Sequence, residues 1–240
     1  MYTIGIINYI NSIPLSYGLE THFTIVKDTP RRLAQRFKHG ELDGAFIPSV
    51  DYLCHKDTYF RVEGVSISSF GSVGSVFLIK KRGAVIKAVL ESSESITSNF
   101  IARVIIEKKY GAIPLMFKEH ECCQTDARII IGDTALKNCV YSADEEIMDL
   151  GEEWYALTGL PLIYAVSVAR DPQSAHRMSG VFIQNLHRNL SSLDAVLTAC
   201  KMSEYGDYLR KINYGWSELH DISLSTLEMF YRQDNLCTAK

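Results

Sequence analysis

Residues 3–14, with the sequence TIGIINYINSIP, join a run of β-branched side chains to a polar turn. The first five of these residues are typical of a buried strand, because apolar β-branched side chains fit the interior of a sheet. Asn11 and Ser12 before Pro14 are typical of a helix start, where polar side chains cap free N–H groups. The sequence therefore places Asn11 between a strand and a helix. In open α/β sheets that position commonly binds ligands, although a capped helix without a ligand would show the same pattern.

The next segments repeat this strand-turn-helix pattern. Residues 24–27 predict a second strand, residues 30–37 a helix, and residues 45–47 a third strand. An alternation of strand, helix and strand predicts a parallel sheet within an α/β fold. Ser49 follows the third strand and offers a hydroxyl at its carboxyl end, as Asn11 offers an amide after the first.

Residues 65–79, VSISSFGSVGSVFLI, are rich in serine and glycine between two strand-like runs. Glycine lets the backbone approach a ligand closely, and serine hydroxyls form hydrogen bonds without bringing charge. Ser68, Gly74 and Ser75 are therefore candidate ligand-binding residues, and a bulged hairpin without a ligand is the alternative. The basic run at residues 80–83 changes the composition, and there we expect the chain to cross into a second lobe.

The second lobe is expected to contain a long amphipathic helix at residues 99–110. Thr97 and Ser98 precede it, at an amino end where unsatisfied N–H groups and the helix dipole attract a carboxylate. Asp133 similarly follows a strand predicted at residues 127–131. For all three residues, simple helix capping is the alternative.

A strand predicted at residues 162–168 is long enough to return to the first lobe. The helices after it show amphipathic spacing without a chemical motif, so we assign them to packing on that lobe. Two crossings predict a clamshell of two α/β domains, residues 1–80 with 166–240, and residues 81–165. A cleft between domains is a common ligand site.

Composition restricts the classes of function. The 240 residues are 47% hydrophobic and 22% charged with a formal net charge of −3, so we expect a globular protein and no nucleic-acid partner. No apolar run approaches the roughly 20 residues of a membrane span and no signal-like pattern opens the chain, so we expect no membrane partner and a cytoplasmic location. The cysteines and histidines lack metal-ligand spacing, so we expect neither a metal nor an organic cofactor.

Six stretches carry a more specific signal when they are taken in order. They are YINSIPL at 9–15, ELDGAFIPSVDYL at 41–53, SISSFGSVGSVFLIKK at 66–81, SESITSN at 93–99, IIIGDTAL at 129–136 and DLGEEWYALTGLPLIYA at 149–165. Together they resemble the signatures of the MqnA family, the chorismate dehydratases of the futalosine route to menaquinone. Any one stretch is a weak signal, whereas six in order are a strong one.

The resemblance implies a bilobal, type 2 periplasmic-binding-protein-like clamshell with two crossover strands. It also implies a cytoplasmic hydro-lyase that converts chorismate, its small-molecule substrate, into 3-[(1-carboxyvinyl)oxy]benzoate by losing water, without a cofactor. Chorismate carries two carboxylates, yet the motif residues are nearly all uncharged. Helix amino ends at Asn11/Ser12 and Thr97/Ser98 would therefore supply dipoles and N–H groups in place of cationic side chains.

Catalytic roles follow from what this reaction needs. Asn11 is expected to orient the substrate and to donate a hydrogen bond to the departing hydroxyl. Two groups are candidates for the base that removes the proton at C3. They are Asp133 and the substrate's own enolpyruvyl carboxylate, and the resemblance favours the second. Two positions depart from the family pattern, since Gly74 stands where an arginine is frequent and Ser167 where an aromatic residue is. The expected substrate-binding residues are Ser12, Ser49, Ser68, Gly74, Ser75, Thr97 and Ser98.

Two other functions are compatible with the same fold class. One is a non-catalytic protein that binds or senses a small carboxylate, because fold does not fix function. The other is the sister enzyme 1,4-dihydroxy-6-naphthoate synthase, although that family opens with a different polar motif and relies on an active-site histidine. The choice between a monomer and a homodimer stays open at this point.

Overall fold

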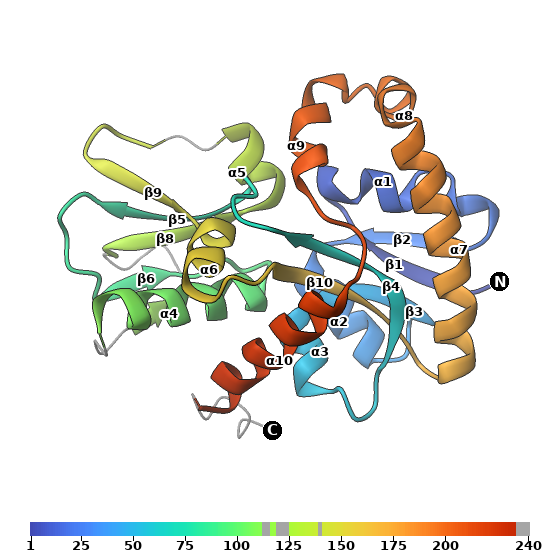
Figure 1. Cartoon of the computed structure of the whole chain (residues 1–240), viewed down its shortest axis with the longest axis horizontal. Coiled ribbons are helices and arrows are strands. Elements are labelled where there is room, and N and C mark those ends of the chain that lie inside the picture. The colour runs from blue at the N-terminus through green and yellow to red at the C-terminus, as the bar shows by residue number, and fades with distance from the viewer. Residues whose placement is uncertain (112–115, 119–124, 139–140, 234–240) are drawn as a thin grey trace.

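The computed structural model describes residues 1–111, 116–118, 125–138 and 141–233. It contains two five-stranded sheets, each covered by helices, which lie side by side (Figure 1). We call the sheet β2-β1-β3-β10-β4 with its helices the first lobe, and the sheet β7-β6-β8-β5-β9 with its helices the second lobe. The predicted α/β clamshell is confirmed.

The first sheet is parallel where the sequence predicts it. Strand β1 (Thr3–Ile7) pairs in parallel with β2 (Thr24–Asp28) and β3 (Gly44–Pro48). Strand β10 (Leu162–Ala169) runs antiparallel between β3 and β4 (Phe60–Ser69). Both β3 and most of β10 are buried, as expected for apolar strands covered on two faces.

Helices of the first lobe follow from the spacing of their apolar residues. Helix α2 (Pro30–Lys38) buries Pro30, Leu33, Ala34 and Phe37, the spacing of a single helical face. It contacts β1 and β3, while the 20-residue helix α7 (Pro172–Ser191) contacts β4, β10 and the short helix α1 (Ile13–Ser16). Helix α3 (Ser49–Cys54) directly continues β3.

The second sheet is mixed and built around β5 (Val76–Lys81). Strand β5 runs antiparallel to both of its neighbours, β8 (Ala127–Ile131) and β9 (Glu145–Asp149). On the other side of β8, the short strands β6 (Ala88–Leu90) and β7 (Met116–Lys118) continue the sheet in parallel. Its helices are α4 (Ile96–Tyr110), α5 (Gly132–Asn138) and α6 (Leu150–Thr158).

The first crossing lies before the basic run, at residues 70–75 between β4 and β5. The boundary expected after residue 80 differs from this arrangement, because β5 belongs to the second sheet. Lys80 is buried within that strand and forms an ion pair with Glu146 of β9. The basic residues therefore end a strand of the second lobe and do not mark the crossing.

The return crossing passes through α6, and β10 begins at Leu162 in the first sheet. The boundary expected between residues 165 and 166 thus falls inside β10. From sheet membership we propose that the first lobe comprises residues 1–69 and 162–233, the second residues 76–149, and that α6 connects them.

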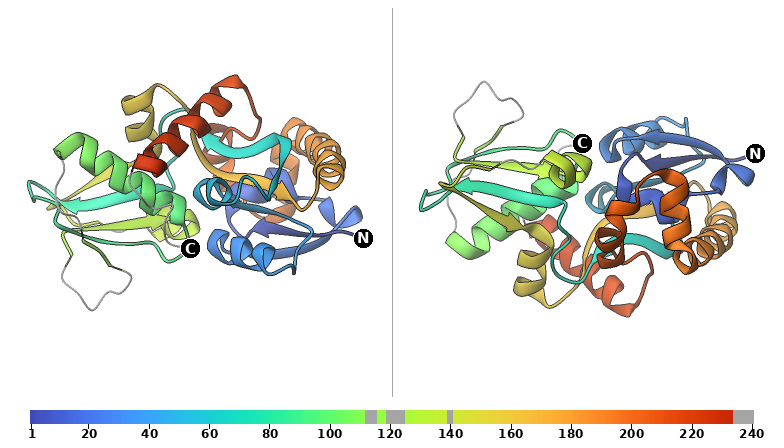
Figure 2. Two further views of the ribbon diagram at one scale, coloured as in Figure 1. Left: turned by 90° about the horizontal axis from the view of Figure 1, so that it is seen from below. Right: turned by 90° about the horizontal axis from the view of Figure 1, so that it is seen from above.

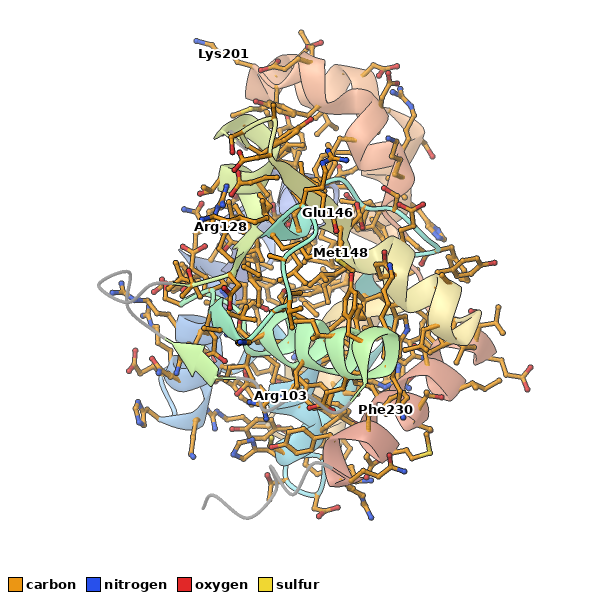
Figure 3. All side chains as sticks on the ribbon, turned by 90° about the vertical axis from the view of Figure 1, so that its left-hand side faces the viewer. Arg103, Arg128, Glu146, Met148, Lys201 and Phe230 are labelled. Carbon is orange, nitrogen blue, oxygen red and sulfur yellow. The ribbon has the colours of Figure 1, made fainter. Side chains whose placement is uncertain are left out.

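The helices that end the chain pack on more than the first lobe. They are α8 (Leu193–Cys200), α9 (Gly206–Lys211) and α10 (Glu218–Gln233). Helix α10 lies between the lobes in both views of Figure 2, with the ring of Tyr231 against Phe100 of α4 and the ring of Phe230 against Trp154 of α6. Phe230 also lies beneath α4 in Figure 3. The Nζ atom of Lys108, in α4, is 5.3 Å from the centre of its ring. Helix α10 therefore contacts the second lobe and α6 in addition to α3 and β10 of the first lobe.

Across the part of the chain that the structure describes, no helix combines the length and the apolar character that a membrane span requires.

Candidate active site

A narrow pocket lies between the two lobes, lined from one side by the carboxyl end of β1 and from the other by that of β8. Its volume is about 40 Å³, well below that of a typical small-molecule site, because the lobes close tightly around it. Its polar lining residues are Tyr9, Asn11, Ser75, Ser95, Ser98 and Tyr164.

Asn11 lines this pocket, as predicted, at the turn that follows β1. Residues 10–12 form a 3-10 turn, and α1 begins at Ile13 with Pro14 in its first turn. Capping does not explain the polar residues, because neither Asn11 nor Ser12 makes a side-chain capping bond. Instead, the Ser12 hydroxyl donates to Asn11 Oδ1 at 3.2 Å. Among the described residues nothing accepts from Asn11 Nδ2, so its amide protons are available to a ligand.

The amino end of α4 also opens on the pocket, through Ser95 and Ser98. Ser95 caps the helix, since its Oγ accepts from the Ser98 N–H at 3.2 Å and from the Ser98 hydroxyl at 3.1 Å. The helix therefore begins at Ile96, three residues before the predicted start. A helix of 15 residues places partial positive charge and unpaired N–H groups at this end.

Thr97 lies in the same turn but faces elsewhere. Its Oγ1 accepts a hydrogen bond from the Val50 N–H at 3.1 Å, so it joins the start of α4 to α3 of the other lobe. Thr97 is a predicted substrate-binding residue, but it is not among the described residues that line the pocket.

Ser49 and Ser68 do not reach the pocket either. The Ser49 hydroxyl donates to the Ile163 carbonyl at 2.7 Å. Ser68 belongs to a buried network, in which its Oγ donates to the Asn213 carbonyl at 3.0 Å and contacts His220 Nε2 at 3.0 Å. Neighbouring side chains alternate between the faces of a strand, and because Ile67 lines the pocket, Ser68 points to the opposite face.

Gly74 occupies the crossing segment beside the pocket, and its N–H is already bound. It donates to Asp149 Oδ2 at 2.7 Å, next to the Val73 N–H at 3.0 Å and the Ser72 hydroxyl at 2.9 Å. Asp149 also caps α6, so one carboxylate joins the crossing segment to a helix start. Gly74 has φ +77°, which favours glycine, and nothing lies within 4 Å of where its Cβ would be.

Ser75 lines the pocket at the start of the second sheet, as predicted. Its carbonyl accepts from the Gly132 N–H at 2.8 Å. Its hydroxyl accepts from the phenol of Tyr208 in α9, at 2.9 Å. The structure thus brings together Asn11, Ser75 and Ser98 from three separate segments.

Asp133 sits at the start of α5 and connects the lobes. Its Oδ1 accepts from the Ile10 N–H at 2.9 Å, and its Oδ2 pairs with Lys137 at 3.3 Å. Both carboxylate oxygens are therefore engaged by the protein, and Asp133 is absent from the described lining of the pocket.

Tyr9 is a lining residue that sequence patterns did not reveal. Its hydroxyl donates to Glu94 Oε2 at 2.6 Å, and burial together with this carboxylate raises the pKa of Tyr9 well above its ordinary value. Its ring packs on Gly132, where an added Cβ would lie 2.8 Å from Tyr9 Cε2. With φ +62° as well, position 132 requires glycine.

Tyr164 and Ser95 were also missed. The Tyr164 hydroxyl is hydrogen-bonded to Ser69 Oγ at 2.8 Å, and burial raises its pKa well above the ordinary value, so the phenol stays protonated. A tyrosine inside an apolar strand has no distinguishing pattern. Ser95 could have been recognised, because serine is a favoured N-cap residue and a helical run follows it directly.

Cationic and metal-binding groups are lacking in the described lining. It includes no lysine, arginine or histidine. Nor do the described residues contain a group of three His, Cys, Asp or Glu side chains able to hold a metal ion.

A wider hollow of about 600 Å³ lies elsewhere, among α7, α8 and α9. It is open to solvent and contains the ion pair of Arg210 and Asp194. The interlobe pocket is the better candidate, because it lies between two lobes and its described lining holds Asn11, Ser75 and Ser98 without any charged side chain, whereas the hollow holds an ion pair.

Comparison with known proteins identifies the family. A family model described as menaquinone biosynthesis matches residues 2–233. The chain belongs to this family. The family resemblance of the six sequence stretches is thereby confirmed. Among curated relatives, the chorismate dehydratase of Thermus thermophilus is 28% identical over 189 residues, which cover 69% of this chain and 68% of that protein.

Solved structures support the fold of this chain. A protein from Archaeoglobus fulgidus superposes with a TM-score of 0.74 at 13% identity, covering 98% of both chains. The periplasmic aliphatic sulphonate binding protein of Escherichia coli superposes with a TM-score of 0.66 at 12% identity, covering 98% of this chain and 87% of that one. At such identities the similarity concerns the fold alone, which is that of periplasmic binding proteins.

Proposed function

We propose that this protein is a chorismate dehydratase, which converts chorismate into 3-[(1-carboxyvinyl)oxy]benzoate and water in the synthesis of menaquinone. One observation supports it above others: in a chain of the menaquinone biosynthesis family, Asn11, Ser75 and the amino end of α4 converge on one interlobe pocket. The relative named chorismate dehydratase adds support. Hydro-lyase activity and a cytoplasmic location are parts of the same proposal.

In this proposal, neutral donors and a helix dipole stabilise the two carboxylates of chorismate, because the described lining of the pocket holds no cationic side chain. The positive end of the α4 dipole attracts one carboxylate, and the side chains of Ser95 and Ser98 shape that end of the pocket. A helix amino end stabilises an anion by about 0.3–1 kcal/mol when exposed and by up to about 2 kcal/mol when partly buried. The free Nδ2 of Asn11 and the hydroxyl of Ser75 are further neutral donors.

Proton removal is assigned to the substrate's own enolpyruvyl carboxylate. The C3 proton moves to that carboxylate, the electron pair of the C3–H bond forms the C3–C4 double bond, and the C4 hydroxyl leaves as water after taking up this proton. The ring becomes aromatic, so the demand on the protein is kinetic. Asp133 supports this assignment indirectly, because its two oxygens are engaged by Ile10 and Lys137.

Asn11 is proposed to hold the substrate in the reactive orientation and to donate a hydrogen bond from Nδ2 to the departing hydroxyl or to the developing negative charge. Ser12 keeps the Asn11 amide turned toward the pocket by bonding its Oδ1. Donors placed where charge develops lower the barrier more than those that bind the ground state.

Incubation of the purified protein with chorismate tests this proposal. We expect chorismate to disappear as a benzoate-type absorbance rises, with a product mass lower by one water. Binding of chorismate without conversion would contradict the proposal and favour a non-catalytic carboxylate-binding protein.

A further inference from the structure

Tyr208, in the helices that end the chain, contacts the lining residue Ser75 of the pocket. It lies on α9, which packs on the first lobe, and its phenol donates to Ser75 Oγ at 2.9 Å. Ser75 belongs to the crossing segment and is 1% exposed. A helix without any recognisable motif thus touches a lining residue 133 positions away in the sequence.

The direction of this hydrogen bond follows from the chemistry of the two hydroxyls. A phenol is a stronger acid than an alcohol, so it is the better donor, and the serine oxygen is the better acceptor. Burial raises the pKa of Tyr208 above its ordinary value, and the carboxylates of Asp133 and Asp149 act in the same direction. The phenol therefore keeps the proton that it donates.

Ser75 has a hydroxyl proton that is free to bind a ligand. Its carbonyl is bound by the Gly132 N–H at 2.8 Å and its Oγ accepts from Tyr208, whereas nothing in the described chain accepts its own hydroxyl proton. Because Ser75 lines the pocket, that proton is available to an oxygen of the ligand. A hydroxyl that accepts a hydrogen bond is also a stronger donor.

We propose that Tyr208 is a positioning residue, which sets the Ser75 hydroxyl so that its proton faces an anionic oxygen of the substrate. This inference rests on the proposed function, since it concerns the same pocket. It assigns a role in the active site to a helix that the sequence assigns to packing.

Tyr214 provides a matched control close by. It follows the same helix and is buried, whereas Tyr208 is half-buried. Among the described residues the Tyr214 hydroxyl has no hydrogen-bond partner. Tyr214→Phe therefore removes the same group from a buried tyrosine without breaking a hydrogen bond. Its kcat/KM is expected to stay within about twofold of the wild-type value.

The test is a double-mutant cycle of Tyr208→Phe and Ser75→Ala, measured on chorismate. Tyr208→Phe alone is expected to lower kcat/KM by about tenfold, the size of effect seen when a residue that orients a ligand-binding side chain is removed. In the Ser75→Ala background, the same substitution is expected to change kcat/KM by less than about twofold. The loss caused by Tyr208→Phe should fall on the same parameter, kcat or KM, as the loss caused by Ser75→Ala.

The outcomes separate this inference from the proposed function. Equal losses from Tyr208→Phe in both backgrounds would show that Tyr208 acts by packing, and would overturn the positioning role. An equal loss in Tyr214→Phe would do the same. If the wild-type protein does not convert chorismate, the proposed function fails and the positioning role fails with it.

Discussion

The phenolic oxygen of Tyr9 lies 2.6 Å from Glu94 Oε2, so the first lobe is bonded to the second across their shared pocket. Backbone contacts reinforce this bond: the Arg31 N–H donates to the Glu94 carbonyl at 3.1 Å, and the Ile10 N–H donates to Asp133 at 2.9 Å. These contacts stabilise a closed arrangement of the lobes.

Tyr9→Phe removes the Tyr9–Glu94 bond and keeps the ring. A hydrogen bond to a carboxylate contributes about 1.5–3 kcal/mol, so the closed arrangement should weaken and kcat/KM should fall about tenfold or more. Small-angle scattering should show a larger radius of gyration for the free variant. Tyr17→Phe is the control, because Tyr17 is exposed. Unchanged kinetics and size in Tyr9→Phe would refute this role in closure.

Asn11→Asp replaces a neutral donor by an anion that faces a doubly charged substrate. We expect turnover to fall by about 10²–10³, the effect of losing one donor to developing charge, while the fold stays intact. Steady-state kinetics on chorismate and circular dichroism measure the two effects. Near-normal turnover would remove Asn11 from the mechanism.

Asp133→Asn distinguishes the two candidate bases. Asparagine Oδ1 can still accept from the Ile10 N–H, so the contact between the lobes survives. We expect activity within about tenfold of wild type, or about 1.4 kcal/mol of barrier. A loss of several orders of magnitude would instead identify Asp133 as an essential base.

Asp51 makes stability depend on pH. Its Oδ2 is buried without a partner in the described structure, and burial raises the pKa of Asp51 to about 6 from 3.8. The folded state therefore holds this proton more tightly than the unfolded state, so the contribution to stability is full below pH 3.8 and is lost as the pH rises through 6.

Asp51→Asn should consequently stabilise the protein at pH 7.5, by about 1–3 kcal/mol, and much less at pH 4.5. Urea unfolding at both pH values measures the difference. Asp57→Asn, at an exposed aspartate nearby, should show little change at either pH. Equal effects of the two substitutions would contradict the buried, unpaired carboxylate.

His220 acts on stability in the opposite direction. Its Nδ1 accepts from the Ser217 N–H at 3.1 Å, and burial lowers the pKa of His220. The unfolded state then binds the proton more tightly, so this contribution is full above pH 6.5 and is lost as the pH falls toward the folded-state value. His220→Gln should reduce the fall in unfolding free energy between pH 7 and pH 5. An unchanged fall would exclude His220 as its source.

Local patterns were sufficient for the strand-turn-helix units and for part of the site. The run before Asn11, the serine-glycine segment around Ser75 and the polar start of α4 each occupy consecutive residues, and local backbone preferences produce them. For that reason, the parallel strands, the two-lobed α/β class and the pocket positions of Asn11, Ser75 and Ser98 could be predicted.

Tertiary packing settled the remaining features. Ser68 looks like Ser75 in sequence, but the face of β4 that meets the pocket carries Ile67, and strand alternation turns Ser68 away. The bonds from Tyr9 to Glu94 and from Tyr208 to Ser75 join residues 85 and 133 positions apart. Such contacts leave no periodic signal along the chain, because they form only after both lobes have folded and the chain has crossed between them twice.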